Sequence, residues 1–148
     1  MPNIYPVFSA PELAAREANL QTVRYGKSFH FDFAKGDFTL EGDGKVSETD
    51  GYQAWVQWCL KAVLTRRFTY LAYSGQFGME RDGIRRIPAR NGVQAELARV
   101  ITEALLADPR TEAVTDFAYD WQGDGVRVGF TVKPVIGTRE RLEVSIND

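Results

Sequence analysis

Hydrophobic and polar positions alternate with a period of two near residue 30. Phe29, Phe31 and Phe33 alternate with polar or small residues, and a turn at residues 35–37 leads into the apolar residues of 38–40. Alternation on both sides of a glycine-containing turn predicts a β-hairpin, here with one aromatic face.

Two longer segments repeat apolar residues at the i, i+3, i+4, i+7 spacing of a helix with one buried face. The first runs from a cap at Asp50 to about Thr65, and the second from a cap at Asn91 to near Ala107. Because Cys59 falls in the middle of the first stripe, we expect a buried, unreactive thiol. The residues predicted to face the core are Tyr52, Trp55, Val56, Cys59, Leu60 and Val63 in the first helix, and Val93, Leu97, Val100, Ile101, Ala104 and Leu105 in the second.

The last third of the chain returns to a period of two. Thr115, Phe117, Tyr119 and Trp121 share one predicted face, and two further alternating runs lie within residues 126–146. Three consecutive runs of this kind predict an antiparallel meander with one core face. The predicted fold class is α+β, a small antiparallel or mixed sheet with an early hairpin, two main helices and a C-terminal strand meander.

A length of 148 residues predicts one domain with a core that needs no disulfides or metals. We divide the chain into an N-terminal arm, residues 1–27, and a folded domain, residues 28–148. The arm has few apolar residues, and Pro2, Pro6 and Pro11 favour an extended start that lacks the pattern of a secretory signal. Two interpretations of the arm stay open, a segment that lies on another surface and a partly ordered terminus.

The charge balance argues against polyanionic partners. The chain has 18 Lys and Arg residues against 20 Asp and Glu, a net charge of −2, whereas nucleic-acid affinity comes mainly from basic residues. No run approaches the roughly 20 apolar residues of a membrane span, so we expect neither nucleic-acid nor membrane contacts. One cysteine and one histidine exclude a thiolate zinc site and indicate a protein without metal or cofactor in a reducing compartment.

Enzymatic signals are weak. The sequence has no glycine-rich phosphate loop, nucleophile elbow or zinc-protease motif. Glu41, Asp43, Glu48 and Asp50, in and beside a predicted polar loop at 41–49, include candidates for the paired carboxylates of a glycan hydrolase. We interpret them as solvated surface residues, because charged residues are mostly exposed, and we predict no catalytic residue.

The first candidate binding site is the junction after the second predicted helix. Asp108-Pro109-Arg110 follows that helix, and proline restricts the backbone from which Arg110 projects. The planar guanidinium suits a partner's carboxylate or carbonyl groups, with Asp108 as the residue that orients it. An ordinary helix stop with a solvated arginine is the alternative. Trp58 lies off the apolar stripe of the first helix, where it either covers the edge of the stripe or anchors a partner.

The second candidate is the last predicted strand, Glu140 to Ile146. Arg141 and Glu143 alternate with apolar residues, as in an edge strand that charged side chains protect from unwanted pairing. Because an edge strand has unpaired backbone groups, a partner's strand can add to it.

From about Phe29 to Ile146 the chain resembles the sheath initiators of contractile tails, a family that includes lysozyme-like baseplate wedge proteins and the XkdS-like and TssE-like proteins. The resemblance rests on the order and spacing of the early hairpin, the two helices, the segment 65–78 and the Asp-Pro-Arg junction at 108–110. The family's hallmark at this junction is Glu-Pro-Arg. This sequence keeps the negative charge, the proline and the arginine but has the shorter acid Asp108.

The resemblance implies a structural, non-enzymatic component of a contractile phage tail or tail-like particle. It implies docking on the helical bundle of the baseplate wedge through Asp108 and Arg110, and initiation of the sheath by strand pairing with sheath subunits. The implied partners are other wedge proteins, the tail sheath protein, and the tail tube or hub. The implied location is the virion tail baseplate, assembled in the host cytoplasm. The alternatives are a peptidoglycan glycan hydrolase and a free adaptor that binds one partner by strand addition.

Overall fold

The structure, a computed structural model, describes residues 23–147. Most of the predicted arm, residues 1–22, lies outside the described residues. Tyr25, near the end of the arm, packs against the core and donates its hydroxyl hydrogen to the carbonyl oxygen of Ile136 at 2.8 Å. The division of the chain at residue 28 stays a prediction.

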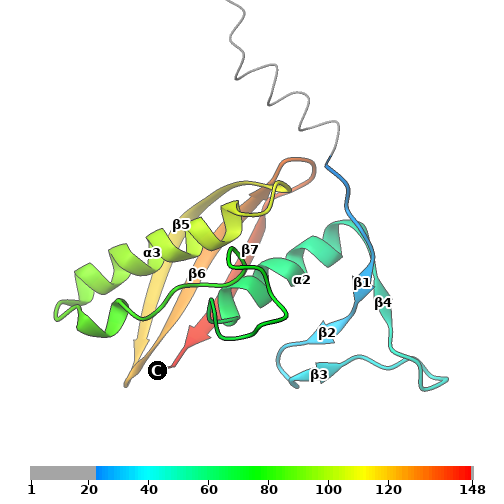
Figure 1. Ribbon diagram of the computed structural model, residues 1–148, viewed down its shortest axis with the longest axis horizontal. Coiled ribbons are helices and arrows are strands. Elements are labelled where there is room, and N and C mark those ends of the chain that lie inside the picture. Colours follow the sequence, from blue (N-terminus) through cyan, green and yellow to red (C-terminus); the bar gives the residue numbers. More distant parts are fainter. Residues whose placement is uncertain (1–22, 148) are drawn as a thin grey trace, which may run out of the picture.

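A three-stranded antiparallel sheet covered on one face by two helices forms the centre of the fold (Figure 1). The strands β5 (Thr111–Gln122), β6 (Gly125–Pro134) and β7 (Glu140–Ile146) pair in that order. Helix α3 (Arg90–Leu106) packs against β5, helix α2 (Gly51–Leu64) packs against β7, and the two helices contact each other. This arrangement confirms the predicted α+β fold class and the predicted meander.

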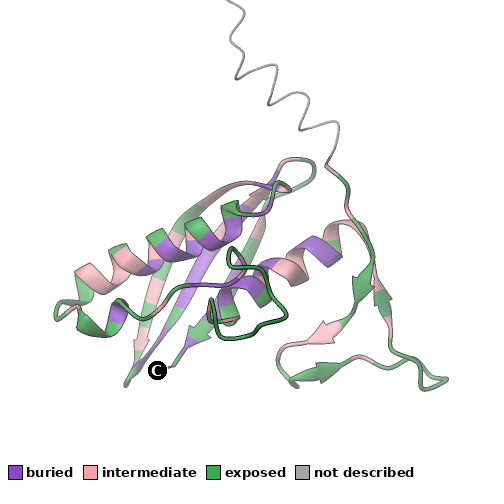
Figure 2. Cartoon of the chain, in the orientation of Figure 1, coloured by how far each residue is buried: buried purple, intermediate pink, exposed green. Residues whose placement is uncertain are grey.

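The hydrophobic core lies between the two helices and the sheet, and buried residues are concentrated on their facing sides (Figure 2). Trp55 and Phe130 are the largest fully buried side chains. Burial raises the pKa of the Cys59 thiol to about 12, which leaves it protonated and unreactive at neutral pH. The predicted core residues that are buried are Trp55, Cys59 and Val63 on α2, and Leu97, Val100, Ile101, Ala104 and Leu105 on α3.

Both helices begin near their predicted starts, without the expected side-chain caps. Asp50 occupies the N-cap position of α2 but its side chain makes no capping hydrogen bond. The predicted cap Asn91 is wrong, because α3 begins at Arg90 with Ala89 as its N-cap. The carbonyl oxygen of Ala89 already accepts a helical hydrogen bond from the N–H of Val93 at 3.1 Å, which places Asn91 inside the first turn.

A β-bulge changes the phase of β5, and the prediction that Thr115 shares one face with Phe117, Tyr119 and Trp121 is wrong. The register with β6 shifts between Thr115 and Ala118, and Asp116 within this shift has a φ of 56°. One extra residue in a strand reverses the alternation of its side chains. Val114 therefore packs against the core together with Phe117, whereas Thr115 is exposed.

Four short strands stand beside α2, apart from the three-stranded sheet (Figure 1). β2 (Phe31–Asp32) pairs with β3 (Asp37–Phe38), which confirms the early hairpin. β1 (Ser28–Phe29) pairs with β4 (Glu48–Thr49), so the end of the predicted polar loop also takes part in strand pairing. No helix among the described residues is long and apolar enough to cross a membrane.

Candidate partner-binding site

The junction between α3 and β5 holds Arg110 against Asp108. The Asp108 carboxylate accepts a hydrogen bond from the backbone N–H of Arg110 at 2.8 Å. It also accepts hydrogen bonds from the Nε–H and Nη2–H of the Arg110 side chain at 2.9 and 2.6 Å. The side chains of Arg110 and Asp108 are only 17% and 9% exposed, and the hydrogen bonds that the guanidinium donates to Asp108 raise the pKa of the guanidinium further. Asp108 thus orients the guanidinium as predicted, and the alternative of a solvated arginine does not describe this side chain.

Trp58 lies beside this junction on the exposed flank of α2. Its ring lies 5.7 Å below the guanidinium carbon of Arg110 and 5.9 Å from the ring of Phe77. The tryptophan is half-buried and packs against the edge of the core. It therefore covers the edge of the apolar stripe, and its ring lies in cation–π range of Arg110. The fold brings Trp58, Asp108, Pro109 and Arg110 to one place, across 50 residues of sequence.

The early strands are attached to α2 through the amide of Gln57. The N–H of Phe31 donates to the Gln57 side-chain oxygen at 2.8 Å, and the Gln57 side-chain nitrogen donates to the carbonyl oxygen of Phe29. Two neighbouring hollows of about 490 Å³ each lie beside these strands, and Phe31, Phe33 and Lys61 line both. We call these two hollows the aromatic groove. Its lining residues are Ser28, Phe29, Phe31, Phe33, Phe38, Ala54, Gln57, Trp58, Lys61 and Tyr73 in the first hollow, and Phe31, Phe33, Lys61, Leu64, Thr65, Arg66, Thr69 and Tyr70 in the second.

One wall of the groove is residues 66–78, which we call the aromatic loop. At its base, the N–H of Met79 donates to the carbonyl oxygen of Thr65 at 2.9 Å. The N–H of Arg67 in turn donates to the carbonyl oxygen of Met79 at 3.0 Å. Met79 is fully buried. Gly78, with a φ of 97°, allows the close approach of the two ends, because a Cβ atom there would lie 2.8 Å from the Thr65 oxygen. The base of the loop is therefore firmly held by the core.

The tip of the aromatic loop is apolar and exposed. Phe68 is 73% exposed and Tyr70 58% exposed, and Leu71 is fully exposed. Phe68 has a φ of 64°, an unfavourable conformation for a bulky residue. An exposed apolar segment in a strained conformation on a fixed base is typical of a binding surface.

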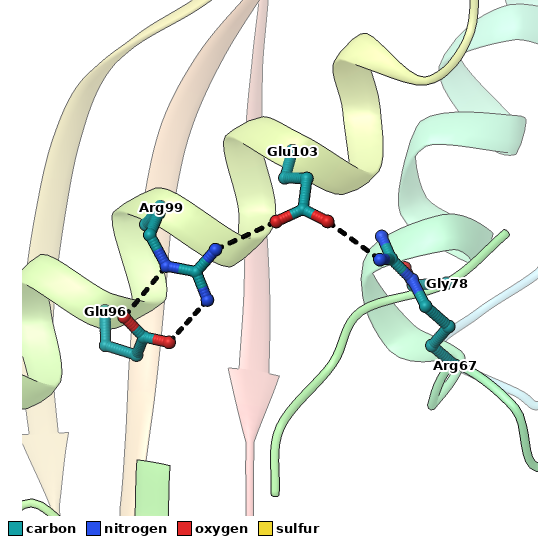
Figure 3. Close-up of polar contacts among 5 residues, drawn as sticks. All are labelled: Arg67, Gly78, Glu96, Arg99 and Glu103. Atoms are coloured by element: carbon teal, nitrogen blue, oxygen red, sulfur yellow. Dashed lines mark hydrogen bonds and ion pairs between the residues drawn. The ribbon is translucent and has the colours of Figure 1, made fainter. Parts of the chain in front are cut away.

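Arginine–glutamate contacts join the aromatic loop to α3 (Figure 3). Arg67 donates to Glu103 at 2.8 Å and to the carbonyl oxygen of Gly78 at 3.1 Å. Arg99 donates to Glu103 at 2.9 Å and to Glu96 at 2.6 Å. The hydrogen bond from Arg67 holds the pKa of Glu103 below its ordinary value. The contribution of the Glu103–arginine contacts to the free energy of unfolding is therefore present at neutral pH, and it is lost when the pH falls through the lowered pKa of Glu103.

The other two predicted binding residues, Arg141 and Glu143, lie on β7 and face away from the helices. Leu142 and Val144, which alternate with them, are buried in the core on the opposite face of the sheet. Arg141 crosses above Gly129 and donates to the carbonyl oxygen of Asp116 in the β5 bulge. β7 is an edge strand, paired with β6 alone among the described residues. The predicted binding residues thus fall into two groups, Trp58 with residues 108–110 and the outward face of β7.

The acidic residues considered for glycan hydrolysis are Glu41, Asp43, Glu48 and Asp50, and all four are exposed. Backbone hydrogen bonding by Lys45 lowers the pKa of Asp43, whereas a general acid at neutral pH needs a raised one. Among the residues that the structure describes, no group of three or more His, Cys, Asp or Glu side chains is placed to hold a metal ion.

Sequence reasoning missed the aromatic groove and the display of the aromatic loop. The run Phe68 to Tyr73 is visibly apolar, but its sequence does not reveal whether it is buried. Phe31 and Phe33 indicated one aromatic hairpin face, but not that this face opens toward Lys61 on α2. The available signal was an apolar run without helical or strand period, between Arg66-Arg67 on one side and Gly75 and Gly78 on the other.

A two-layer α+β domain with an exposed aromatic surface and a sheet edge that is unpaired among the described residues is typical of a small protein that binds other proteins. Residues 27–136 match the family model of the contractile injection system sheath initiator, and the chain belongs to this family. It is also 32% identical over 130 residues to the phage-like element PBSX protein XkdS of Bacillus subtilis (strain 168), covering 86% of this chain and 88% of that protein. The chain thus has a structural role in a contractile tail, as the resemblance implied.

Proposed function

We propose that the protein is a baseplate wedge component that docks on the wedge's helical bundle and initiates the sheath by strand pairing. The observation that carries the proposal is the Asp108–Arg110 pair, held together by three side-chain hydrogen bonds and stacked on Trp58 beside the end of α3. Other wedge proteins and the tail sheath protein are the partners, with the tail tube or hub as further neighbours. The protein works in the virion tail baseplate after assembly in the host cytoplasm, and it is not an enzyme.

The wedge contact uses the part of Arg110 that Asp108 leaves available. Asp108 takes the hydrogens of Nε and one of Nη2, whereas Nη1 donates to no residue in the described range 23–147. A carbonyl or carboxylate oxygen at the end of a partner helix would complete these hydrogen bonds. Because Asp108 and Trp58 already hold the guanidinium in place, little side-chain entropy is lost on binding.

The sheath contact uses the free edge of β7. A partner strand that pairs with this edge extends the three-stranded sheet and acquires a defined register. Glu143 is exposed on the outer face of β7 beside this edge, whereas the Arg141 side chain reaches over β6 to the Asp116 carbonyl oxygen on β5. Backbone pairing of this kind orders the first ring of sheath subunits without any reaction.

Replacing Arg110 by alanine is expected to reduce the amount of the protein in purified particles by about tenfold or more, as loss of a central binding residue does. Recruitment is measured by quantitative mass spectrometry of particles. Arg110→Lys keeps the charge but not the planar fork and is expected to restore recruitment only in part. Asp108→Glu, which recreates the acid of the family hallmark, is expected to keep recruitment.

Arg139→Ala, at an exposed arginine in the loop between β6 and β7, is the matched control. Truncation of Arg110 also leaves the buried Asp108 without its partner, at a cost of about 1–3 kcal/mol, so denaturation curves must show that each variant is folded. Normal recruitment of a folded Arg110→Ala protein would contradict the assignment of the docking residue.

Adding purified sheath protein is expected to slow hydrogen exchange at alternate backbone amides of β7. In the free protein these outward-facing amides have no strand partner, whereas the amides of β6 are protected in both states because β6 is paired on both sides. Exchange is measured by NMR or mass spectrometry. Protection of β5 instead would place the sheath at the opposite edge, and sheath initiation without any new protection would refute strand pairing.

A further inference from the structure

The aromatic groove and the tip of the aromatic loop form one continuous surface beside α2. Phe31, Phe33 and Lys61 line both hollows, Tyr73 lines the first, and Tyr70 lines the second. Five large apolar side chains here are exposed, three of them lining the hollows and two, Phe68 and Leu71, standing on the aromatic loop, and an exposed patch of this kind usually marks a binding site for another chain. They are Phe29, Phe38, Phe68, Tyr70 and Leu71.

The charge of the groove has one sign. Within residues 23–147, the charged side chains that line the two hollows are Lys61 and Arg66, and both are cations. Lys61 projects from α2 and its Nζ lies 4.9 Å above the ring centre of Tyr73, between the two walls. Apolar walls with cations between them complement an apolar segment that carries a carboxylate.

Both walls of the groove are anchored before any partner binds. Gln57 holds the Phe29–Phe31 wall to α2. The opposite wall is fixed by the Thr65–Met79 hydrogen bond and by Tyr73, whose ring lies 4.6 Å from that of Phe77. Since little reorganisation is needed, the exposed aromatic groups are available as preformed anchors.

We propose that the aromatic groove binds an apolar, acidic segment of another protein, with a carboxylate of that segment placed against Lys61. This inference deepens the proposed docking function and rests on it, because Trp58 connects the groove to Arg110. It adds the chemistry of the bound segment: apolar side chains for the two hollows and an Asp or Glu between them. Phe68 and Leu71 at the loop tip extend the contact beyond the groove.

The test uses a photoreactive benzoylphenylalanine at position 70, in the full-length protein, in cells that also produce the particle. After irradiation, the particle and soluble fractions are separated and the crosslinked peptides are mapped by mass spectrometry. The expected partner is a segment of another polypeptide with apolar residues and at least one Asp or Glu. The same probe at position 127, on the opposite face of the sheet, is expected not to reach that segment.

Charge reversal then tests the contact at Lys61. Lys61→Glu is expected to reduce the position-70 crosslink by about tenfold or more, and exchange of the mapped carboxylate for lysine is expected to restore it. Arg127→Glu, the matched reversal at an exposed cation away from the groove, is expected to leave the yield unchanged.

Four outcomes overturn the proposal: a crosslink to residues 1–22 of the same chain, one to a second copy of the protein, one to lipid, or no crosslink at all in either fraction. The proposal is also overturned if the crosslinked segment has no carboxylate, or if Lys61→Glu leaves the yield of the position-70 crosslink unchanged. Absence of the protein from the particle fraction refutes the proposed docking function, not the groove proposal. In that case the crosslinked peptides of the soluble fraction still show whether the groove binds an apolar, acidic segment.

Discussion

Replacing Trp55 by alanine is expected to lower the free energy of unfolding by about 3–5 kcal/mol. Trp55 is fully buried in the middle of α2, its ring lies 5.6 Å from that of Tyr52, and its Nε1 donates to the hydroxyl oxygen of Thr111 at 3.1 Å. The substitution leaves a cavity between α2 and the sheet that the surrounding side chains fill only in part. Urea denaturation followed by circular dichroism measures the loss.

Two further variants separate the packing of Trp55 from its hydrogen bond. Thr111→Val keeps the side-chain volume but leaves the indole N–H without an acceptor, so a loss of about 1–3 kcal/mol is expected. Tyr70→Ala removes an exposed aromatic ring and is expected to change stability by less than about 0.5 kcal/mol. If Trp55→Ala cost no more than Tyr70→Ala, the central position of Trp55 in the core would be wrong.

Replacing Gly78 by alanine is expected to cost at least about 2 kcal/mol and to loosen the aromatic loop. Gly78 has a φ of 97°, and an added Cβ would lie 2.8 Å from the oxygen of Thr65 and 3.1 Å from the backbone nitrogen of Arg67. These atoms belong to the backbone at the base of the loop, so relief of the clash must separate its two ends. Urea denaturation measures the cost, and the rate of tryptic cleavage after Arg66 and Arg67 measures the loosening.

Gly83→Ala is the matched control for Gly78→Ala. Gly83 has a φ of −78° at the start of the 3₁₀ turn η1 (Ile84–Arg86), and no atom lies within 4 Å of an added Cβ. Alanine there restricts the unfolded chain without straining the folded one, so no loss or a gain of about 0.4–1 kcal/mol is expected. Equal effects of the two substitutions would contradict the close approach assigned to Gly78.

The helices and the meander were predictable because their side chains repeat with the period of the element they form. Leu97, Ile101 and Leu105 lie on one face of α3 wherever that helix is placed, and a core is the only stable environment for that face. Thr115 shows where this reasoning ends. Its sequence pattern continues without a break, but the bulge at Asp116 inserts one residue into the pairing with β6, and only the partner strand reveals it.

The candidate site was predictable in part. Proline after a helix and the short distance between Asp108 and Arg110 along the chain indicated a local pair, and the structure contains it. That Trp58 lies below Arg110 was not predictable, because the two residues come from different elements that meet only when α2 and α3 pack together. The roles of all these residues in binding stay predictions.

By itself, the sequence determined the fold class, the two buried helix faces, the order of the last three strands and, through its resemblance, the sheath initiator family. These properties depend on the period of apolar residues and on motifs within short stretches of chain. The tertiary structure alone decided that the aromatic loop is displayed on the surface and that a groove with a cationic centre opens beside α2. The physical reason is that exposure depends on what packs against a segment: Met79 and Gly78 anchor the ends of the aromatic loop, while no described residue covers Leu71 at its tip.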